Sequence, residues 1–417
     1  MPKTDAIIDR DRLWEDIMAL GAVTDPARPY TRRSFSQLFL EGRAWLAERF
    51  LAAGLSTHID AAGNLIGRRE GEDPQAGTIV IGSHSDSVPS GGRFDGMAGV
   101  IAGLAIARDL RDQGIMLGHA LEIVDFLAEE PSEYGISCVG SRGITGMLSP
   151  ADLRLHNKQD ETLEAALSRM GGDPGRLAIR TDIAAGFELH IEQGPVLEAK
   201  EINIGIVTSI VGITRIEIIF QGTAGHAGTT PMTLRRDPLI AAAGLLGWIR
   251  NKAEAFAARG RGHFVATTGI VEVLPNASNV IPKTARIVVD ARSEDRDLME
   301  EFCRALDAES LAFADAANVD RLNLTRLSDS MPAACDPALQ ELLGASADAS
   351  GRSSMRMASG AGHDMAFISL VAPVAMVFIP CKGGRSHTPE EWASPEALAA
   401  GTEVLLDAIL SFDSSSR

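Results

Sequence analysis

The feature that most constrains the fold of this chain is an apolar run that ends in a histidine and two carboxylates. Thr78-Ile79-Val80-Ile81 predicts a buried β-strand, and the Gly/Ser/Pro-rich segment after it predicts a loop at the strand's carboxyl end. The loop carries His84 and Asp95 as candidate ligands for zinc or manganese, and Asp86, which could accept the second ring N–H of His84. Open α/β sheets bind ligands at this edge. A lone His-x-Asp is more often plain loop surface, so the rest of the chain decides between the two interpretations.

Three later segments repeat the pattern. The run from Ala120 to Ala128 ends in Glu129 and Glu130. Neighbouring side chains of a strand point to opposite sides, so one carboxylate could bind metal while the other stays free as a base. His190 and His387 follow further apolar runs. Five side chains thus form a ligand set suited to two metals that share one aspartate: His84, Asp95, Glu130, His190 and His387.

In combination and in this order, the motifs resemble those of the hydantoinase/carbamoylase family of dinuclear metal amidohydrolases, relatives of aminoacylases and zinc carboxypeptidases. The resemblance covers nearly the whole chain. It implies an α/β fold, with a mixed-sheet catalytic domain of the zinc-peptidase kind and a smaller inserted α+β domain. The segments that carry it are Gly82–Gly96, Glu129-Glu130, Gly140–Gly143, His190–Pro195 and Ser386–Pro389.

The resemblance also implies a role for each residue of the site. Glu129 would be the general base, and Asp86 would orient His84. Each of two divalent ions would have three protein ligands, which leaves room for a water or a substrate oxygen. Zinc and manganese are the expected ions, and cobalt and nickel would accept the same ligands. The implied ligands are His84 and His190 for one ion, Glu130 and His387 for the other, and Asp95 as the bridge.

Composition predicts a folded protein of two domains. The chain has 417 residues, too many for one compact core, with 45% apolar and 23% charged residues. Acidic residues outnumber basic ones by 56 to 39, and the formal charge of −17 argues against nucleic acid or an anionic membrane as the main partner. No segment is typical of a secretory signal or a membrane span, so we expect a cytoplasmic enzyme.

The cysteines indicate neither a zinc knot nor a disulfide framework. They are widely scattered and form no C-x-x-C pair, so we expect reduced thiols. Cys381 precedes the His387 loop, but without a nearby activating base we interpret it as a buried, inert thiol rather than a nucleophile.

The pattern between His190 and His387 differs from its flanks and predicts a β-α-β-β-α-β unit that folds as its own domain. We place the catalytic domain at residues 1–211 and 330–417 and the insert at residues 212–329. The family resemblance implies the same layout, a homodimer formed through the insert, and insert residues that reach the partner's active site. The expected elements are strands at Ile213–Phe220, around Pro275, around Asp290 and at Val319–Leu327, and helices at Pro238–Glu254 and Asp297–Ala308.

The insert also carries candidate substrate-binding residues. The resemblance implies that His226 stabilises a developing oxyanion and that Asn279 and Arg292 hold a substrate carboxylate, a task that suits the planar fork of arginine. From the residues alone, turn chemistry for Asn279 and a solvated charge for Arg292 remain equal alternatives. The catalytic domain would add polar contacts from Gln193 and Gly360.

These observations predict a metal-dependent amidohydrolase. A hydroxide between the metals would attack the carbonyl of an N-carbamoyl (ureido) acid, such as an N-carbamoyl-L-amino acid or allantoate, and Glu129 would pass the water's proton to the leaving nitrogen. An N-acyl-amino-acid deacylase or dipeptidase with the same site is the alternative. A catalytically silent metal-binding scaffold belongs to another class, and the complete set of ligands and base argues against it.

One departure from the family pattern bears on the substrate. After the acidic pair the chain reads Pro131-Ser132-Glu133-Tyr134-Gly135, where better-known allantoate and carbamoyl-amino-acid hydrolases tend to have Gly-Ser-Arg-Phe-Gly. An acid in place of a base beside the metal loop alters which charged substrate is accepted, unless Glu133 points to solvent.

Overall fold

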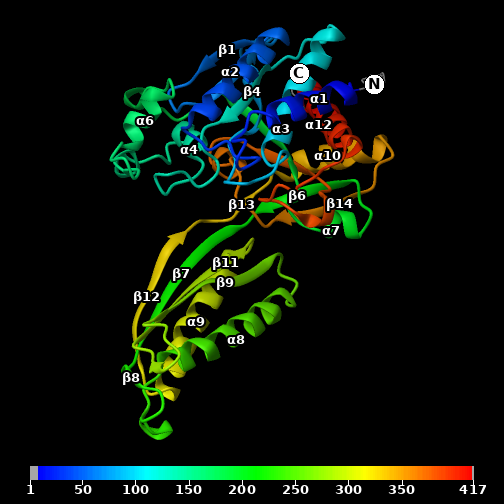
Figure 1. Cartoon of the computed structure of the whole chain (residues 1–417). Helices are drawn as coiled ribbons and strands as arrows, with labels where there is room; N and C mark the ends of the chain where they lie inside the picture. Colours follow the sequence, from blue (N-terminus) through cyan, green and yellow to red (C-terminus); the bar gives the residue numbers. More distant parts are fainter. Residues whose placement is uncertain (1–7, 416–417) are drawn as a thin grey trace. The chain divides into compact units, whose positions relative to one another are not determined.

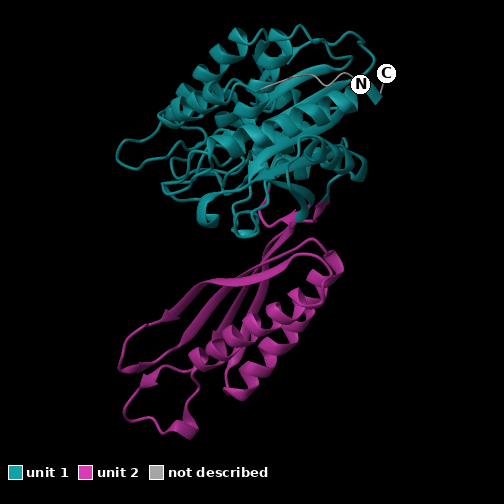
Figure 2. Cartoon of the chain, turned by 90° about the vertical axis from the view of Figure 1, so that its right-hand side faces the viewer, with its two compact units in different colours: residues 1–208, 334–357, 363–417 teal, residues 209–333, 358–362 magenta. Residues whose placement is uncertain are grey.

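The computed structural model describes residues 8–415, which divide into two units (Figure 2). Unit 1 comprises residues 1–208, 334–357 and 363–417, and unit 2 comprises residues 209–333 and 358–362. Gly360, expected from the sequence in the catalytic domain, therefore belongs to unit 2. The reason is local pairing, because the Val211 N–H donates to the Ser359 carbonyl at 3.1 Å and Arg292 Nη1 donates to the Gly360 carbonyl at 2.8 Å.

Unit 1 is built on a nine-stranded mixed sheet (Figure 1). The strand order is β1-β2-β4-β3-β5-β15-β6-β13, with β14 beside β6. The central strands β4, β3, β5 and β15 are parallel neighbours, whereas β2 and β6 pair with them in antiparallel fashion. The bounds are β1 Ser56–Ile59, β2 Leu65–Arg69, β3 Thr78–His84, β4 Ala120–Phe126, β5 Ile183–Ile191, β6 Ile204–Ile210, β13 Ala333–Ala334, β14 Ser354–Ser359 and β15 Val374–Ile379.

Helices cover the central strands of this sheet. All residues of β3, β4 and β15 are buried, as expected for strands that are covered on both faces and therefore carry continuous apolar runs. The largest apolar cluster joins these strands to α1, α3 and α12. Within residues 8–415, no helix combines the length and apolar character needed to cross a membrane. The helices are α1 Arg10–Gly21, α2 Gln37–Ala52, α3 Met97–Asp112, α4 Val139–Ile144, α5 Pro150–Leu153, α6 Leu163–Arg169, α7 Val196–Ala199, α10 Pro337–Ala349, α11 Met365–Ile368 and α12 Pro395–Ser415.

The polar segments follow the carboxyl ends of the four parallel strands, which meet at one edge of the sheet.

The sequence interpretation of the acidic pair needs one correction. Strand β4 ends at Phe126, so Glu129 and Glu130 lie in the loop beyond it and strand alternation does not separate their side chains. The loop turns at Ala128, whose φ of 55° is left-handed.

Unit 2 is a four-stranded antiparallel sheet with two long helices packed on it. The strand order is β12-β7-β11-β9, and burial alternates along β7 because only one face meets the apolar core. The chain order β7-α8-β9-β11-α9-β12 is the one expected from the sequence, and a two-stranded ribbon of β8 and β10 is added. The bounds are β7 Gly212–Gln221, β8 Gly225–His226, α8 Pro238–Ala257, β9 Phe264–Leu274, β10 Val280–Ile281, β11 Thr284–Ser293, α9 Arg296–Ala316 and β12 Asp320–Asp329.

Candidate metal centre

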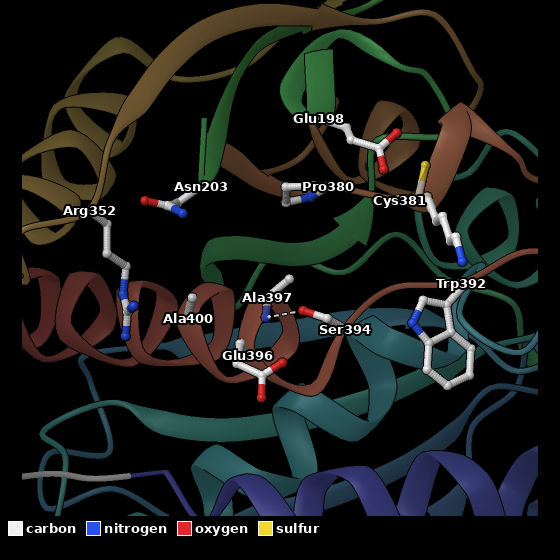
Figure 3. A pocket seen from close by; sticks show the side chains of 11 residues that line it. Glu198, Asn203, Arg352, Pro380, Cys381, Trp392, Ser394, Glu396, Ala397 and Ala400 are labelled. Atoms are coloured by element: carbon white, nitrogen blue, oxygen red, sulfur yellow. Dashed lines mark hydrogen bonds between the residues drawn. The ribbon is translucent and has the colours of Figure 1, made fainter. Parts of the chain in front are cut away.

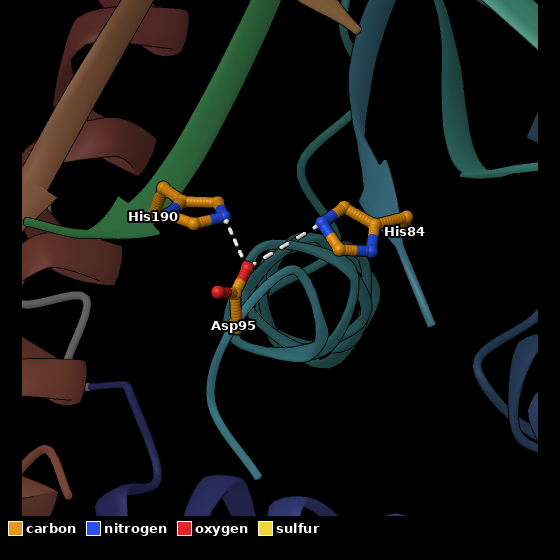
Figure 4. A group of neighbouring side chains, drawn as sticks. All are labelled: His84, Asp95 and His190. Atoms are coloured by element: carbon orange, nitrogen blue, oxygen red, sulfur yellow. Dashed lines mark ion pairs between the residues drawn. The ribbon is translucent and has the colours of Figure 1, made fainter. Parts of the chain in front are cut away.

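The Asp95 carboxylate lies between the three histidines that the sequence nominates as metal ligands. Its Oδ1 is 3.6 Å from Nε2 of His84 and 3.1 Å from Nε2 of His190 (Figure 4). Its Oδ2 is 3.2 Å from Nε2 of His387, and that nitrogen is also 3.2 Å from Oε1 of Glu130. The two oxygens of one carboxylate therefore face two separate groups, His84 with His190 and Glu130 with His387.

These two groups fit a pair of divalent cations. Within each three-residue group, Asp95 included, the candidate ligand atoms lie within 4.8 Å of one another. Bonds of roughly 2.0–2.2 Å to a tetrahedral ion hold ligand atoms roughly 3–3.5 Å apart, close to the distances observed here. Imidazole with carboxylate is a donor set that zinc and manganese accept. The structure thus brings together all five residues named as ligands from the sequence.

Backbone carbonyls fix the orientation of two of the histidine rings. Nδ1 of His84 lies 3.0 Å from the Asp86 carbonyl oxygen, and Nδ1 of His190 lies 2.8 Å from that of Ile191. A carbonyl only accepts hydrogen bonds, so each Nδ1 carries a hydrogen, and each Nε2, which faces Asp95, is the nitrogen that could bind a cation once it has no proton. The sequence assigned the orienting of His84 to the Asp86 side chain, but the nearer contact is the Asp86 main chain, because the carboxylate Oδ1 is 3.5 Å away.

The Asp86 carboxylate instead supports the acidic loop. It is fully buried and accepts hydrogen bonds at 3.3 Å from the backbone N–H groups of both Glu129 and Glu130. Hydrogen bonds to a charged acceptor are about twice as strong as neutral ones. Asp86 therefore fixes the backbone that carries the proposed base and one proposed ligand.

Glu129 has the surroundings expected of a general base. Its Oε2 lies 3.6 Å from Nε2 of His84, and it belongs to neither three-residue ligand group. Burial raises the pKa of Glu129 well above its ordinary value; the nearby acids Glu130, Asp364 and Asp86 add to this, and His84 opposes it. A carboxylate whose pKa is raised can both take and return a proton near neutral pH.

The carboxylates of the cluster favour protonated imidazoles. Hydrogen bonds to Asp95 and Glu130 raise the pKa of His387 to about 11. Burial lowers the pKa of His84, but the charge of Glu129 and the hydrogen bonds to nearby carboxylates outweigh burial and raise that pKa well above its usual value. A metal ligand is a neutral imidazole, so protons and a cation compete for the same ring nitrogens.

Three left-handed residues other than glycine carry parts of the cluster. Ala128, Gln193 and His387 have φ values of 55°, 56° and 56°. Such strained backbone is concentrated at functional sites, where the surrounding structure enforces it. Gln193, a predicted substrate contact, donates from Nε2 to Asp95 Oδ2 at 2.7 Å, so its amide is already engaged with the cluster.

The predicted substrate residues of unit 2 fall into two places. His226 lies opposite Val280 in the β8/β10 ribbon, the Ala227 N–H donates to the Asn279 carbonyl at 3.0 Å, and the side chains of His226 and Asn279 are exposed. Arg292 is near the other end of β11, eight residues past Thr284, which corresponds to about 26 Å of strand. The structure therefore does not bring Asn279 and Arg292 together within one chain.

Arg292 already has partners in unit 2. Its Nε donates to Asp290 Oδ1 at 2.8 Å, and its Nη1 donates to the Gly360 carbonyl at 2.8 Å. Gly360 thus contributes a carbonyl that orients the guanidinium. The Asp290 contact means that a substrate carboxylate would share Arg292 with an acid of the same unit.

A cavity of about 440 Å³ in unit 1 shares no lining residue with the proposed metal ligands (Figure 3). Its wall includes Cys381, Trp392 and Arg352. Burial raises the pKa of the Cys381 thiol to about 12, so it carries almost no thiolate at neutral pH. This agrees with the interpretation of Cys381 as an inert thiol.

Comparison with known proteins identifies the family. Residues 80–411 match Peptidase family M20/M25/M40. The chain is 37% identical over 404 residues to an N-carbamoyl-L-amino acid amidohydrolase of Geobacillus stearothermophilus, across 96% of this chain and 97% of that protein. It is 32% identical over 382 residues to an allantoate amidohydrolase of Bacillus subtilis (strain 168), across 90% and 91% of the two chains. The crystal structure of an amidase of the hydantoinase/carbamoylase family from Burkholderia multivorans superposes with a TM-score of 0.90 at 34% identity, over 98% of each chain. The chain therefore belongs to the M20/M25/M40 peptidase family and, within it, to the hydantoinase/carbamoylase family that its motifs resemble.

Proposed function

We propose that this protein is a metal-dependent amidohydrolase that cleaves the C–N bond of the carbamoyl group in a small ureido acid, such as an N-carbamoyl-L-amino acid or allantoate. The observation that carries the proposal is the Asp95 carboxylate, whose oxygens face two separate ligand groups with the buried Glu129 beside one of them. Relatives named for N-carbamoyl-L-amino acid and allantoate hydrolysis match almost the full chain, which supports the ureido group as the substrate class.

The proposed centre would hold two divalent ions. Ions bound there supply Lewis-acid polarisation of the substrate carbonyl and lower the pKa of a water. Zinc and manganese are the proposed ions, and cobalt and nickel are alternatives. The proposed ligands are His84 and His190 for one ion, Glu130 and His387 for the other, and Asp95 for both.

Glu129 would move the proton of the reaction. It takes a proton from the attacking water, whose oxygen forms a bond to the carbamoyl carbon. It then delivers that proton to the leaving nitrogen as the C–N bond breaks. Burial supports this role because it raises the pKa of Glu129 well above its ordinary value. For an N-carbamoyl amino acid, cleavage of one C–N bond leaves a carbamic acid, which decomposes, so that the final products are the amino acid, carbon dioxide and ammonia.

We further propose a homodimer in which the inserted units of the two chains complete each site. His226 would stabilise negative charge that develops on the carbonyl oxygen, and Asn279 and Arg292 would hold the substrate carboxylate. Because Asn279 and Arg292 lie near opposite ends of one sheet, a single chain cannot offer both to one small molecule. This separation supports a site that takes Arg292 from one chain and His226 with Asn279 from the other.

Hydrolysis of an N-acyl amino acid or a dipeptide is the second candidate, and the observation in its favour is the membership of a peptidase family. The same base and metal ligands would serve it, with a larger pocket for the acyl group. A silent metal-binding scaffold is the remaining alternative. The cytoplasmic location expected from the sequence stays a prediction.

The test is ammonia release by metal-depleted protein, with and without added manganese or zinc, from a panel of N-carbamoyl-L-amino acids and allantoate. We expect metal-dependent ammonia release that Glu129→Gln lowers by about 10²–10⁴-fold, the usual contribution of a general base. Glu133→Gln is the matched control, because Glu133 is exposed in the same loop. Release of amine from N-acyl amino acids or dipeptides without any ammonia would select the second candidate, and inactivity on every compound with two ions bound would select the scaffold.

A further inference from the structure

Another buried carboxylate, that of Glu391, contacts the Asp95 loop and has no part in the mechanism above. Its residue is 1% exposed. Its Oε1 accepts hydrogen bonds from the backbone N–H groups of Phe94, at 2.8 Å, and of Asp95, at 3.0 Å. Glu391 thus binds the backbone of Asp95, which is 296 residues away in the sequence. The Asp95 carboxylate is the one that faces both ligand groups.

Ser386 links the same carboxylate to the Asp95 side chain. Its Oγ lies 2.7 Å from Asp95 Oδ2 and 2.9 Å from Glu391 Oε2. A hydroxyl has one hydrogen, so it donates to one of these oxygens at a time. Glu391 therefore contacts the main chain of the proposed ligand Asp95. It also contacts Ser386, the residue directly before the proposed ligand His387.

The Asp95 loop is shaped to receive Glu391. A Cβ atom at Gly92 would lie 1.8 Å from Glu391 Oε1, so only a glycine leaves the space that the carboxylate occupies. Burial of a carboxylate without hydrogen-bond partners is strongly unfavourable. Here two backbone N–H groups donate to Glu391 Oε1, and the Ser386 hydroxyl lies within hydrogen-bond distance of Oε2. The neighbour Glu390 is exposed, and its side chain accepts a hydrogen bond from Thr388 rather than from the Asp95 loop.

We propose that Glu391 is a positioning residue for the metal centre. It fixes the backbone of Asp95 and, through Ser386, the direction of Oδ2, so that the two carboxylate oxygens stay turned toward different ligand groups. The inference rests on the metal centre proposed above and deepens it. Residues that hold metal ligands in this way typically change metal affinity by about 10–100-fold when they are removed.

The test measures zinc and manganese affinity of the full-length chain by competition with a chelator, without substrate, and the thermal unfolding of the metal-free protein. We expect Glu391→Ala to weaken affinity by about 10–100-fold. Glu391→Gln keeps an oxygen for the two N–H groups and should recover most of that loss. Ser386→Ala should weaken affinity by a smaller factor, and the control Glu390→Ala should leave it unchanged.

Parental metal affinity in Glu391→Ala would overturn the proposal, even if that variant unfolds at a lower temperature. A merely structural role of Glu391 predicts a lower unfolding temperature with unchanged metal affinity. If Glu391→Ala does not fold, Ser386→Ala decides, and parental affinity there would also overturn it. A failure of the proposed function can be told apart from a failure of this proposal. If the parental protein binds two ions but releases no ammonia, the proposed function fails and the affinity comparison stays valid. If the parental protein binds no ions, both the proposed function and the positioning role of Glu391 are refuted.

Discussion

The buried ion pair of Arg43 with Asp125 gives the most quantitative prediction for the stability of unit 1. Their side chains are 4% and 0% exposed, and Arg43 Nε lies 2.9 Å from Asp125 Oδ2. Arg43 also donates to the carbonyls of Gly63 and Asp125. Asp125 Oδ2 accepts from the Ser85 hydroxyl at 3.0 Å, directly between His84 and Asp86. The pair therefore supports the loop that carries the first proposed ligand.

Arg43→Met removes the cation and leaves Asp125 buried without its charge partner. The loss of one member of a buried pair costs about 3–5 kcal/mol, and an unfolding entropy of about 2.1 cal/mol/K per residue converts 1 kcal/mol into about 1.7 °C for a unit of about 280 residues. We expect the midpoint to fall by about 5–8 °C. The deficit should shrink as the pH falls, because burial raises the pKa of Asp125, and protonation removes the uncompensated charge.

Differential scanning calorimetry of the metal-free protein between pH 5 and pH 8 measures this effect. Arg43→Met with Asp125→Leu should recover most of the stability, because a buried pair can be replaced by apolar residues at little cost. Arg250→Met is the surface control, since its pair with Glu254 is exposed and such pairs contribute below about 1 kcal/mol. A shift below 2 °C in Arg43→Met, or a deficit that grows toward low pH, would refute the reasoning.

Two further predictions concern the site. Metal affinity should rise with pH from about 6 upward. The reason is that the pKa of His387 is raised to about 11 and that of His84 is also raised, and each imidazole must lose its proton to bind a metal. Chelator competition at several pH values measures the affinity, and a flat profile would contradict the prediction. Arg292→Lys should raise KM about tenfold, near 1.4 kcal/mol, with little change in kcat, because lysine lacks the planar fork that binds a carboxylate. Steady-state kinetics on the ureido substrate check this, and an unchanged KM would exclude Arg292 from substrate binding.

The strand ends are what the sequence predicts best. Continuous apolar runs such as Thr78–Ile81 and Val374–Ile379 can only be strands covered on both faces or buried helix, and the polar segments after them mark the edge where loops gather. Five candidate ligands from segments far apart in the sequence were named this way, and the structure places them within reach of one carboxylate. The prediction works because each ligand lies at the end of a strand or in the loop that follows it, and packing sets where the strands end.

The contacts that orient those ligands could not be predicted. Nδ1 of His84 lies 3.0 Å from the Asp86 carbonyl oxygen and 3.5 Å from the Asp86 carboxylate, and which of the two is nearer depends on how the backbone turns after β3. Glu391 looks like any acid in a polar loop, and only the fold shows that it lies against the N–H groups of Phe94 and Asp95. A sequence pattern records which residues are polar, but a hydrogen bond between segments depends on tertiary geometry.

The two units carry different kinds of proposed site residues, and this difference bears on how the substrate is selected. The proposed metal ligands and the proposed base lie in unit 1, where His84, Asp95, Glu130 and His190 are buried, Glu129 is partly buried and the His387 side chain is 49% exposed. The proposed carboxylate-binding residues Asn279 and Arg292 lie in unit 2, in an exposed turn and a half-buried position. Glu133, the residue that departs from the family pattern, is exposed in a loop, which favours the alternative that it points to solvent. In the proposed function the chemistry therefore depends on residues of unit 1, whereas the substrate carboxylate is held by residues of unit 2.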